Sequence, residues 1–272
     1  MDSKVILITG ASSGIGFNTA KMLAEQGHKV YGAARRVEKI EPLAPLGVTA
    51  LKMDVTDQAS MEAGVNAVIA AEGRIDVLVN NAGYGYFGAI ENVTMEEARR
   101  QIEVNVFGLA ALTKLVIPQM RAQGGGRIIN LASVAGRTVF QYGGWYHVSK
   151  YSVEALSDAL RIELKPFGID VSIIEPGAIK TDWGIIAADH LVESSKGTVY
   201  QQTANEQADT MRKAYTGNFI SSPLVISKAI SRAVNSRRPK TRYRTGFGSH
   251  IAVFFHRILP DRWWDALMRA MF

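Results

Sequence analysis

The stretch Thr9-Gly10-Ala11-Ser12-Ser13-Gly14-Ile15-Gly16 stands between a short apolar run and the start of a helical pattern. In this place Gly10 allows a sharp turn, Gly14 lets the backbone approach a pyrophosphate, and Gly16 permits close packing of the helix on the strand. The N-terminus of that helix would present free N–H groups and the positive end of its dipole to phosphates. The stretch therefore predicts a strand, a phosphate-binding loop and a helix, in that order.

The chain beyond this loop continues the alternation of short strands and longer helices. The apolar runs are short and rich in β-branched residues, as in strands that are buried on both faces. The predicted strands are Val5–Thr9, Lys29–Ala33, Thr49–Met53, Val77–Val79, Arg127–Leu131 and Val171–Ile174, and the predicted helices are Gly14–Gln26, Gln58–Ala71, Met95–Gln123 and Trp145–Phe167. Repeated β-α units indicate a doubly wound α/β fold of the Rossmann type, with a parallel sheet of about seven strands and helices on both faces. Ligands of such sheets bind beyond the carboxyl ends of the strands.

Length and composition indicate one domain in a reducing compartment. The 272 residues can bury a full core, and no linker or repeat divides them, so we expect a single domain over residues 1–272. The chain has no cysteine, which excludes disulfides and agrees with a cytoplasmic location. Its first residues lead directly into a strand, so we expect no signal peptide. We also expect no membrane span, because no apolar run approaches about 18 residues.

Three residues carry the predicted chemistry. Tyr146 and Lys150 are four positions apart, so they share one face of a helix, and Ser133 precedes Tyr146 by thirteen positions. A phenol is a poor proton shuttle at neutral pH, but a fixed cation beside it favours the phenolate and lowers its pKa. An isolated Tyr–Lys pair is more often a solvated pair, and the phosphate loop reverses those odds. The five histidines show no ligand spacing, so we expect no metal site.

The end of the second strand bears on the choice of cofactor. An enzyme that prefers NAD usually has an acidic residue here, about twenty positions after the first glycine, to bind the ribose diol. Ala34 occupies this place, and Arg35 and Arg36 follow it. A guanidinium suits a 2′-phosphate, which favours NADP(H). Glu38 lies close enough in sequence to leave NAD(H) as the alternative, and a solvated arginine pair is the plain structural interpretation.

Together these motifs resemble the short-chain dehydrogenase/reductase family over about residues 4–180. The glycine loop matches the TGxxxGxG pattern of the family, and a second motif matches its NNAG turn. Further matches fall on an adenine-contacting segment, a catalytic tetrad and a segment that holds the nicotinamide. The NNAG turn is Asn80-Asn81-Ala82-Gly83, and the adenine-contacting segment is Met53-Asp54-Val55. The tetrad falls on Asn105, Ser133, Tyr146 and Lys150. The nicotinamide segment is Pro176-Gly177 with Ile179 and Thr181.

The resemblance implies an NAD(P)-dependent oxidoreductase and assigns a role to each member of the tetrad. Ser133 would bind the substrate oxygen, and Tyr146 would donate the proton in reduction or accept it in oxidation. Lys150 would bind the nicotinamide ribose and lower the pKa of the tyrosine. Asn105 would hold a water that links Lys150 to solvent, with a structural amide as the alternative. The implied cofactor contacts are Gly10, Ser12, Ser13, Gly14, Ile15, Gly16, Arg35, Arg36, Asp54, Val55, Asn81, Ala82, Gly83, Val104, Tyr146, Lys150, Pro176, Gly177, Ile179 and Thr181.

The segment between Ser133 and Tyr146 lines the substrate pocket in members of this family. Here it carries several aromatic residues, and Tyr84, Tyr86 and Phe87 follow the NNAG turn. An aromatic cleft suits a bulky hydrophobic ketone, or the matching secondary alcohol, although core packing explains some of these rings equally well. Residues 182–217 are polar and weakly patterned, and the family places its substrate lid there. The predicted substrate contacts are Ser133, Ala135, Phe140, Tyr142 and Tyr146.

Residues 235–272 form a basic and aromatic C-terminal extension. They hold eight basic and two acidic side chains, so the whole net charge of +6 lies in this segment. Its arginines alternate with Phe254-Phe255 and Trp263-Trp264, and Pro260 separates two short helices. Interleaved basic and aromatic residues suit peripheral contact with an anionic membrane, or attraction of a phosphate-bearing lipid. Packing on the body or on a second subunit is the plain alternative, and no nucleic acid is expected, because no reading helix accompanies the charge.

Three hypotheses about function remain open from the sequence. The first is an NADPH-dependent reductase of a hydrophobic ketone, such as a steroid-like molecule. The second is a membrane-surface reductase of acyl ketone lipids of the acyl-dihydroxyacetone phosphate type. The third, a non-catalytic NADPH-binding regulator, is opposed by the complete tetrad. The resemblance also implies a homodimer or homotetramer.

Overall fold

The fold is organised around a seven-stranded sheet in the order β3-β2-β1-β4-β5-β6-β7, in which every neighbouring pair is parallel. The computed structural model describes residues 2–217 and 220–271. The order reverses between β1 and β4, which is the switch point where doubly wound sheets bind ligands. The strands are β1 Val5–Thr9, β2 Lys29–Ala34, β3 Val48–Lys52, β4 Val77–Asn80, β5 Gly126–Leu131, β6 Ile169–Pro176 and β7 Arg242–Thr245.

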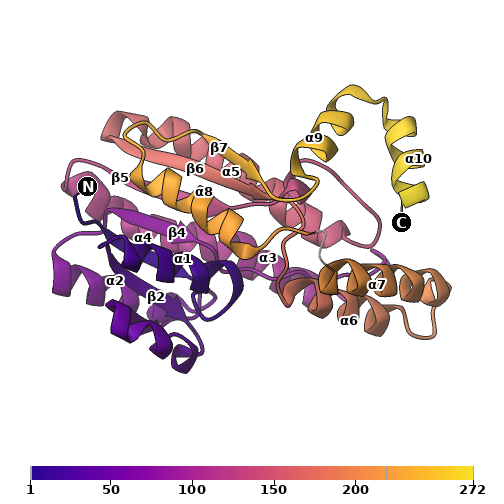
Figure 1. Ribbon diagram of the computed structural model, residues 1–272, viewed down its shortest axis with the longest axis horizontal. Coiled ribbons are helices and arrows are strands. Elements are labelled where there is room, and N and C mark those ends of the chain that lie inside the picture. Colours follow the sequence, from indigo (N-terminus) through magenta and orange to yellow (C-terminus); the bar gives the residue numbers. More distant parts are fainter. Residues whose placement is uncertain (1, 218–219, 272) are drawn as a thin grey trace.

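Helices cover the sheet and extend beyond one end of it (Figure 1). Figure 1 shows α6, α7, α9 and α10 together at one end of the molecule, away from α1 and α2. The α-helices are α1 Gly14–Glu25, α2 Gln58–Glu72, α3 Met95–Ile102, α4 Leu109–Ala122, α5 Gly144–Leu164, α6 Trp183–Ser195, α7 Gln201–Thr216, α8 Pro223–Asn235, α9 Ser249–Ile258 and α10 Asp261–Met271. Short turns are η1 Val37–Lys39, η2 Glu41–Leu46, η4 Val134–Gly136 and η5 Lys165–Phe167, and η3 Glu103–Gly108 is a π-helix.

The period of two along β1 divides the core into two layers. Ile6 and Ile8 pack with Ile230 of α8 on one face of the sheet. Leu7, between them in sequence, packs with Leu112 of α4 on the other face. All of these side chains are fully buried, as strands covered on both faces require. The predicted α/β class with a parallel sheet and helices on both faces is confirmed.

The helical stretch Met95–Ala122, formed by α3, η3 and α4, is long and apolar enough to cross a bilayer by length and composition alone. The expectation that no segment reaches this length is therefore wrong for this helix. Its apolar side chains are explained by the core, because Leu112, Val116 and Met120 are fully buried against the sheet. The π-helical turn in the middle of it carries Asn105.

Most predicted elements lie within one or two residues of the observed ones, and the omissions have a clear cause. β7 is short and basic, so it shows no apolar run, yet it pairs with β6 from Ile173 to Pro176. The lid, which is polar in sequence, forms the two helices α6 and α7. The C-terminal extension forms α9 and α10 on either side of Pro260, as the sequence predicts.

Candidate active site

The phosphate loop joins β1 to α1 and has the backbone that its glycines permit. Gly10 and Gly14 adopt left-handed φ values of 66° and 54°. At Gly16, a Cβ atom would lie 2.3 Å from the carbonyl oxygen of Gly10 and 2.5 Å from Nδ2 of Asn81. Any larger residue at position 16 would therefore push the helix away from the loop. This close packing fixes the N-terminus of α1 beside the ends of the neighbouring strands.

The turn after β4 braces this loop. Asn81 donates side-chain hydrogen bonds to the carbonyl oxygens of Thr9, at 2.8 Å, and of Gly10, at 3.2 Å. The Thr9 hydroxyl accepts backbone N–H bonds from Asn81 at 3.1 Å and Ala82 at 3.0 Å. One residue earlier, at the end of β4, Asn80 donates a 2.9 Å bond to Asn130 of β5. These amides hold the two strand ends at the switch point in fixed register.

A single cleft of about 1580 Å³ opens over the carboxyl ends of the strands. Nearly all of the predicted cofactor contacts line it, and so do three of the four residues that resemble the tetrad. The predicted residues on its walls are Gly10, Ser12, Ser13, Gly14, Ile15, Arg35, Arg36, Asp54, Val55, Asn81, Ala82, Gly83, Val104, Ser133, Ala135, Phe140, Tyr146, Lys150, Pro176, Gly177, Ile179 and Thr181. The volume and the glycine loop fit a dinucleotide.

One end of the cleft is basic. Arg35 and Arg36, which follow β2 directly, are exposed on its wall, and Lys39 lines it one helical turn later. Asp54 lies across from them at the end of β3. Burial raises the pKa of Asp54, but hydrogen bonds from Thr56 and the charge of Arg35 outweigh it, so the pKa is lower than usual. This end therefore offers cations to a phosphate and an ionised carboxylate to a hydroxyl.

Ser133 and Tyr146 meet at the centre of the cleft. Ser133 follows β5, and its hydroxyl accepts a 3.1 Å bond from the Ala135 backbone N–H. Tyr146 lies in the first turn of α5 and is buried, with Pro176 near Ser133 at the end of β6. Burial raises the pKa of the Tyr146 phenol well above its ordinary value, and a side-chain hydrogen bond with Ser133 offsets part of that rise. The phenol is therefore held in its protonated form.

Lys150 lies one turn along α5 from Tyr146. Its Nζ is 5.7 Å from the centroid of the Tyr146 ring and donates a 2.9 Å bond to the Leu131 carbonyl at the end of β5. Burial lowers the pKa of Lys150 to about 8, against the charge of Glu154, which raises it. The net pKa shift of Tyr146 is upward, and burial of the phenol is its main cause. The expected lowering of this pKa by Lys150 stays a prediction.

Asn105 lies behind the cleft rather than on its wall. Its side chain accepts a 3.0 Å bond from the Tyr84 backbone N–H and donates a 2.8 Å bond to the Tyr84 carbonyl. A third bond, of 3.0 Å, joins it to the Ser149 hydroxyl of α5. The π-helical turn at Glu103–Gly108 makes room for these contacts, and such turns are frequent at functional sites. Asn105 thus ties the turn after β4 to the helix that carries Tyr146 and Lys150.

Aromatic rings pack around Tyr146. The Trp183 ring lies 5.0 Å from Tyr146 and the Phe87 ring 5.8 Å, and Phe140 lies 6.0 Å from Phe87, between ring centroids. Tyr215 of α7 approaches Trp183 to 6.4 Å, and burial raises the pKa of Tyr215 to about 12. The wall is therefore apolar above the reacting hydroxyls.

The lid contributed more to this wall than the sequence indicated. The sequence did not predict that Trp183 and Tyr215 line the cleft, because the polar composition of residues 182–217 obscures their helical pattern. The one available signal was that Trp183, an aromatic residue, follows the predicted cofactor contact Thr181 by two positions. Tyr142, in contrast, is not among the described residues that line the cleft. Its hydroxyl pairs with Thr203 at 2.6 Å, and its φ is 63°. The prediction of Tyr142 as a substrate contact is therefore not supported by the geometry.

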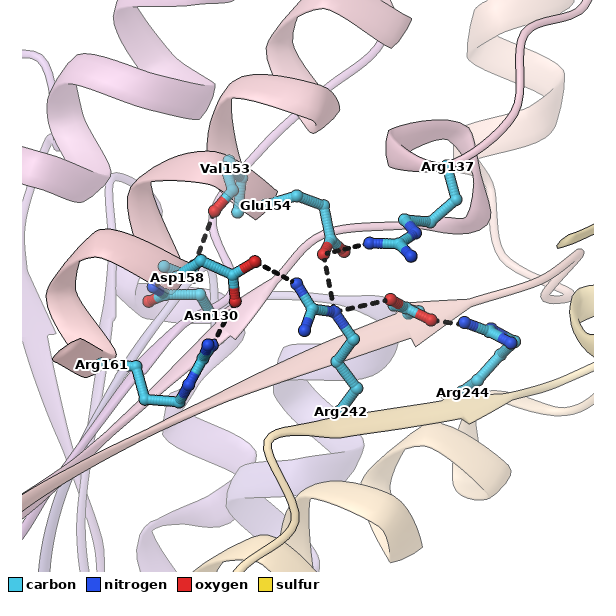
Figure 2. A network of polar contacts seen from close by, with 10 residues as sticks. Asn130, Arg137, Val153, Glu154, Asp158, Arg161, Arg242 and Arg244 are labelled. Carbon is cyan, nitrogen blue, oxygen red and sulfur yellow. Dashed lines mark hydrogen bonds and ion pairs between the residues drawn. The ribbon is translucent and has the colours of Figure 1, made fainter. Parts of the chain in front are cut away.

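A partly buried ion network joins α5 to β6 and β7, beginning at Glu154, four residues after Lys150 (Figure 2). Arg242 of β7 lies in its middle, 3.1 Å from Glu154, 2.6 Å from Asp158 and 3.2 Å from Glu175. Arg244 binds the other oxygen of Glu175 at 2.7 Å. Glu175 is fully buried, and burial together with the charge of Glu175 raises the pKa of Glu154 to about 7, against Arg242, which lowers it. The network joins the C-terminal strand to the helix of Tyr146.

The site brings together three groups that can exchange protons. Within residues 2–217 and 220–271, no group of three or more His, Asp or Glu side chains is arranged to hold a metal ion. Ser133, Tyr146 and Lys150 all line one cleft. A phenol held protonated next to a second hydroxyl can donate a proton to a carbonyl oxygen.

Comparison with known proteins agrees with this arrangement. Residues 4–190 match the family model described as short chain dehydrogenase. The chain is 35% identical over 266 residues to the Helicobacter pylori protein named "Probable short-chain type dehydrogenase/reductase VdlC", covering 97% of this chain and 96% of that protein. It is 45% identical over 182 residues to a 3-ketodihydrosphingosine reductase of Bacteroides thetaiotaomicron, covering 66% of each.

The fold comparison gives the same result. The crystal structure of a short-chain dehydrogenase from Streptomyces avermitilis superposes with a TM-score of 0.80 at 34% identity, covering 94% of this chain and 92% of that one. The chain therefore belongs to the short-chain dehydrogenase/reductase family and is an NAD(P)-dependent oxidoreductase.

Proposed function

We propose that this protein reduces the carbonyl group of a bulky hydrophobic ketone with NADPH, or oxidises the matching secondary alcohol. One observation carries the proposal. The Ser133 and Tyr146 hydroxyls and the Lys150 ammonium line the same cleft as the glycine loop, under a wall of aromatic rings. The loop suits the nucleotide, the hydroxyls suit a carbonyl oxygen, and the rings suit an apolar substrate.

The roles of the chain's own residues follow from their positions. Ser133 donates a hydrogen bond to the carbonyl oxygen and so orients it toward Tyr146. The raised pKa of Tyr146 keeps its proton available for donation to that oxygen in the reduction direction. Lys150 and the Leu131 carbonyl form a polar pair at the base of the cleft, where a ribose hydroxyl would accept from the ammonium. NADPH, when bound, supplies the hydride.

Asn105 supports this site from behind. Its three hydrogen bonds hold the Tyr84 backbone and Ser149 in place, which fixes α5 against the turn after β4. A water held beside Asn105 would complete a path from Lys150 to solvent. Gly83, whose missing Cβ would lie 3.0 Å from the Asn105 Oδ1 and 3.8 Å from the Lys150 Nζ, leaves room between the two groups.

The preference for NADPH rests on the basic end of the cleft. Ala34 stands where an acidic residue would bind the ribose diol, and the exposed Arg35 guanidinium follows it at the wall. A planar guanidinium binds a phosphate through two parallel hydrogen bonds. With Arg36 and Lys39 nearby, this end would hold the 2′-phosphate of NADPH more tightly than the free hydroxyl of NADH.

A second candidate substrate is a long-chain acyl ketone lipid. The 45% identity to a 3-ketodihydrosphingosine reductase favours it, and so do the Met211 and Ile186 side chains of the lid, which extend the apolar lining of the cleft. We place the enzyme in the cytoplasm, with its basic C-terminal extension in peripheral contact with a membrane.

The exposed side of α5 supports self-association. Val148, Tyr151 and Ile162 are exposed apolar residues on α5, and Phe107 of η3 is exposed as well. An apolar helix surface of this kind suits a symmetric contact between two copies. We propose a homodimer, or a homotetramer that contains it.

A panel of ketones and secondary alcohols tests the proposed reaction, with nicotinamide absorbance as the readout. The proposal predicts NADPH oxidation with bulky apolar ketones and little turnover of small sugars. Tight NADPH binding without turnover of any compound would instead identify a nucleotide-binding regulator and would contradict the proposal.

A further inference from the structure

Helix α9 presents its large apolar side chains to solvent. Ile251, Phe254, Phe255 and Ile258 follow the i, i+3, i+4, i+7 spacing of one helix face and are 66%, 59%, 41% and 55% exposed. Val253, on the other side of the helix, is buried. A helix on the surface of a protein usually turns such an apolar stripe toward the core. In α9 the stripe faces solvent instead. The stripe therefore marks a contact surface.

Helix α10 extends the same surface, and Trp264 holds it against the loop after Ser133 and against α9. Trp264 is 6% exposed, and its indole N–H donates a 3.2 Å bond to the Val139 carbonyl in the loop between Ser133 and Tyr146. Its ring also lies 5.0 Å from the His256 ring of α9. Trp263, the next residue, is 69% exposed. One tryptophan holds α10 on the substrate loop, and the other faces water.

The exposed stripe is continuous with the mouth of the cleft. Phe247 and Ala252, at the start of α9, line the cleft, and Phe247 is also exposed. Ile186 of the lid also lines the cleft and is exposed. Figure 1 shows α9 and α10 at the same end of the molecule as the lid helices α6 and α7. An apolar path therefore leads from the outer stripe toward Tyr146.

The positive charge of residues 235–272 favours an anionic lipid surface over a second copy of the chain as the partner of the exposed stripe. Residues 235–272 carry eight basic and two acidic side chains, and Arg257, Arg262 and Arg269 are exposed on α9 and α10. Two copies joined through this surface would bring like charges together, which disfavours a dimer contact here. Arginines flanking phenylalanine and tryptophan are what interfacial helices use on anionic lipid.

We propose that Phe247, Ile251, Phe254, Phe255, Ile258 and Trp263 form a lipid-docking face that seats the enzyme on an anionic membrane with its cleft mouth at the surface. The apolar side chains enter the acyl boundary, and the flanking arginines meet the lipid phosphates. A hydrophobic ketone then reaches Tyr146 from the lipid without crossing water. The last step rests on the proposed function, whereas the docking itself does not.

Sedimentation with vesicles tests the docking on the full-length protein, without ketone or nucleotide. The wild type should sediment with phosphatidylcholine vesicles that contain phosphatidylglycerol and stay in solution with phosphatidylcholine alone. The double variant Phe254→Ser/Ile258→Ser should bind the anionic vesicles at least about tenfold more weakly, because it removes two apolar side chains that would be buried in the lipid. The variant Arg257→Gln/Arg262→Gln should weaken binding and flatten its salt dependence.

The matched control is Leu46→Ser/Phe167→Ser, which removes two exposed apolar side chains before the starts of β3 and β6, whereas α9 follows the end of β7. This control should bind as the wild type does. All variants should keep the wild-type far-UV circular dichroism spectrum, which shows that they are folded. The proposal would be overturned if the wild type did not bind anionic vesicles. It would also be overturned if the stripe variant Phe254→Ser/Ile258→Ser bound them as tightly as the control. Loss of a dimer in the stripe variant, with no lipid binding by the wild type, would assign the face to a second copy instead.

Discussion

The Nζ of Lys150 lies 5.7 Å from the ring centroid of Tyr146, one helical turn away, and both groups are buried. Burial acts on the two in opposite directions, because it disfavours the phenolate of one and the ammonium of the other. The pKa of the phenol is raised, whereas that of the amine falls to about 8. At neutral pH this leaves a protonated phenol beside an ammonium, the combination that the proposed reduction of a carbonyl uses.

This pair predicts the pH dependence of reduction. The Lys150 ammonium is present below about pH 8 and is lost as the pH rises through that value. The ratio kcat/KM for a ketone should therefore fall on the alkaline side of about pH 8. In Glu154→Gln, the fall should move to lower pH, because the lost carboxylate no longer raises the pKa of Lys150. Rate profiles between pH 6 and 10 measure the shift.

Asp158→Asn is the control for that shift. Asp158 lies one turn further along α5, binds the same Arg242 and has a side chain that is 39% exposed. Its removal should leave the alkaline fall in kcat/KM unchanged. If both substitutions move the profile equally, the effect belongs to the whole network and not to the charge nearest Lys150.

The basic end of the cleft predicts cofactor choice. Arg35→Ala should raise the KM for NADPH by about tenfold or more and change that for NADH little, because a charge-assisted contact to the 2′-phosphate is lost. Arg238→Ala, which removes another exposed arginine that is not among the described cleft-lining residues, should change neither value. Equal effects of Arg35→Ala on both cofactors would remove the argument for NADPH.

The close approach at Gly16 predicts loss of nucleotide binding. In Gly16→Ala, the new methyl group would meet the Gly10 carbonyl at 2.3 Å and displace the phosphate loop. NADPH binding, followed by fluorescence titration, should fall below detection while the secondary structure remains. Gly47→Asn, at a left-handed turn with open space around it, should bind NADPH normally. If Gly16→Ala bound NADPH normally, the phosphates of the cofactor would not lie on this glycine loop.

The ion network predicts a pH-dependent loss of stability. Arg242→Ala leaves Glu154 without its nearest cation and removes one of the two arginines that pair with the fully buried Glu175. The free energy of unfolding should therefore fall by about 3 kcal/mol near pH 8. The loss should shrink toward pH 6, because Glu154, with its pKa raised to about 7, takes up a proton and needs no cation. Denaturant unfolding at both pH values measures this, with Arg238→Ala expected within about 0.5 kcal/mol of the wild type. A loss that grows on acidification would contradict the assigned pairing.

The sequence predicted those parts of the molecule that follow local rules. The glycine loop, the alternating apolar runs and the i, i+4 pair of Tyr146 and Lys150 each depend on residues close in the chain, so their placement could be anticipated. The fold class followed from the same pattern. Helix boundaries such as Gln58–Glu72 lay within a residue of the expected ones.

The remaining features depend on contacts between distant segments. Trp183 reaches Tyr146 only because α6 folds over the cleft, and its place two positions after Thr181 is the one local signal of that contact. Tyr142 lies in the expected loop, but its left-handed backbone turns the hydroxyl toward Thr203 of α7. The pKa of Tyr146 was expected to fall because spacing shows a neighbouring charge, whereas burial, which decides the direction, is a property of the whole fold.

The substitution Tyr146→Phe tests the assigned proton donor most directly. It removes one hydroxyl and keeps the ring, so NADPH should bind with wild-type affinity while kcat for ketone reduction falls by about 10²- to 10⁴-fold. Tyr151→Phe, on the exposed side of the same helix, should keep full activity. A Tyr146→Phe enzyme that reduces ketones at the wild-type rate would contradict the account.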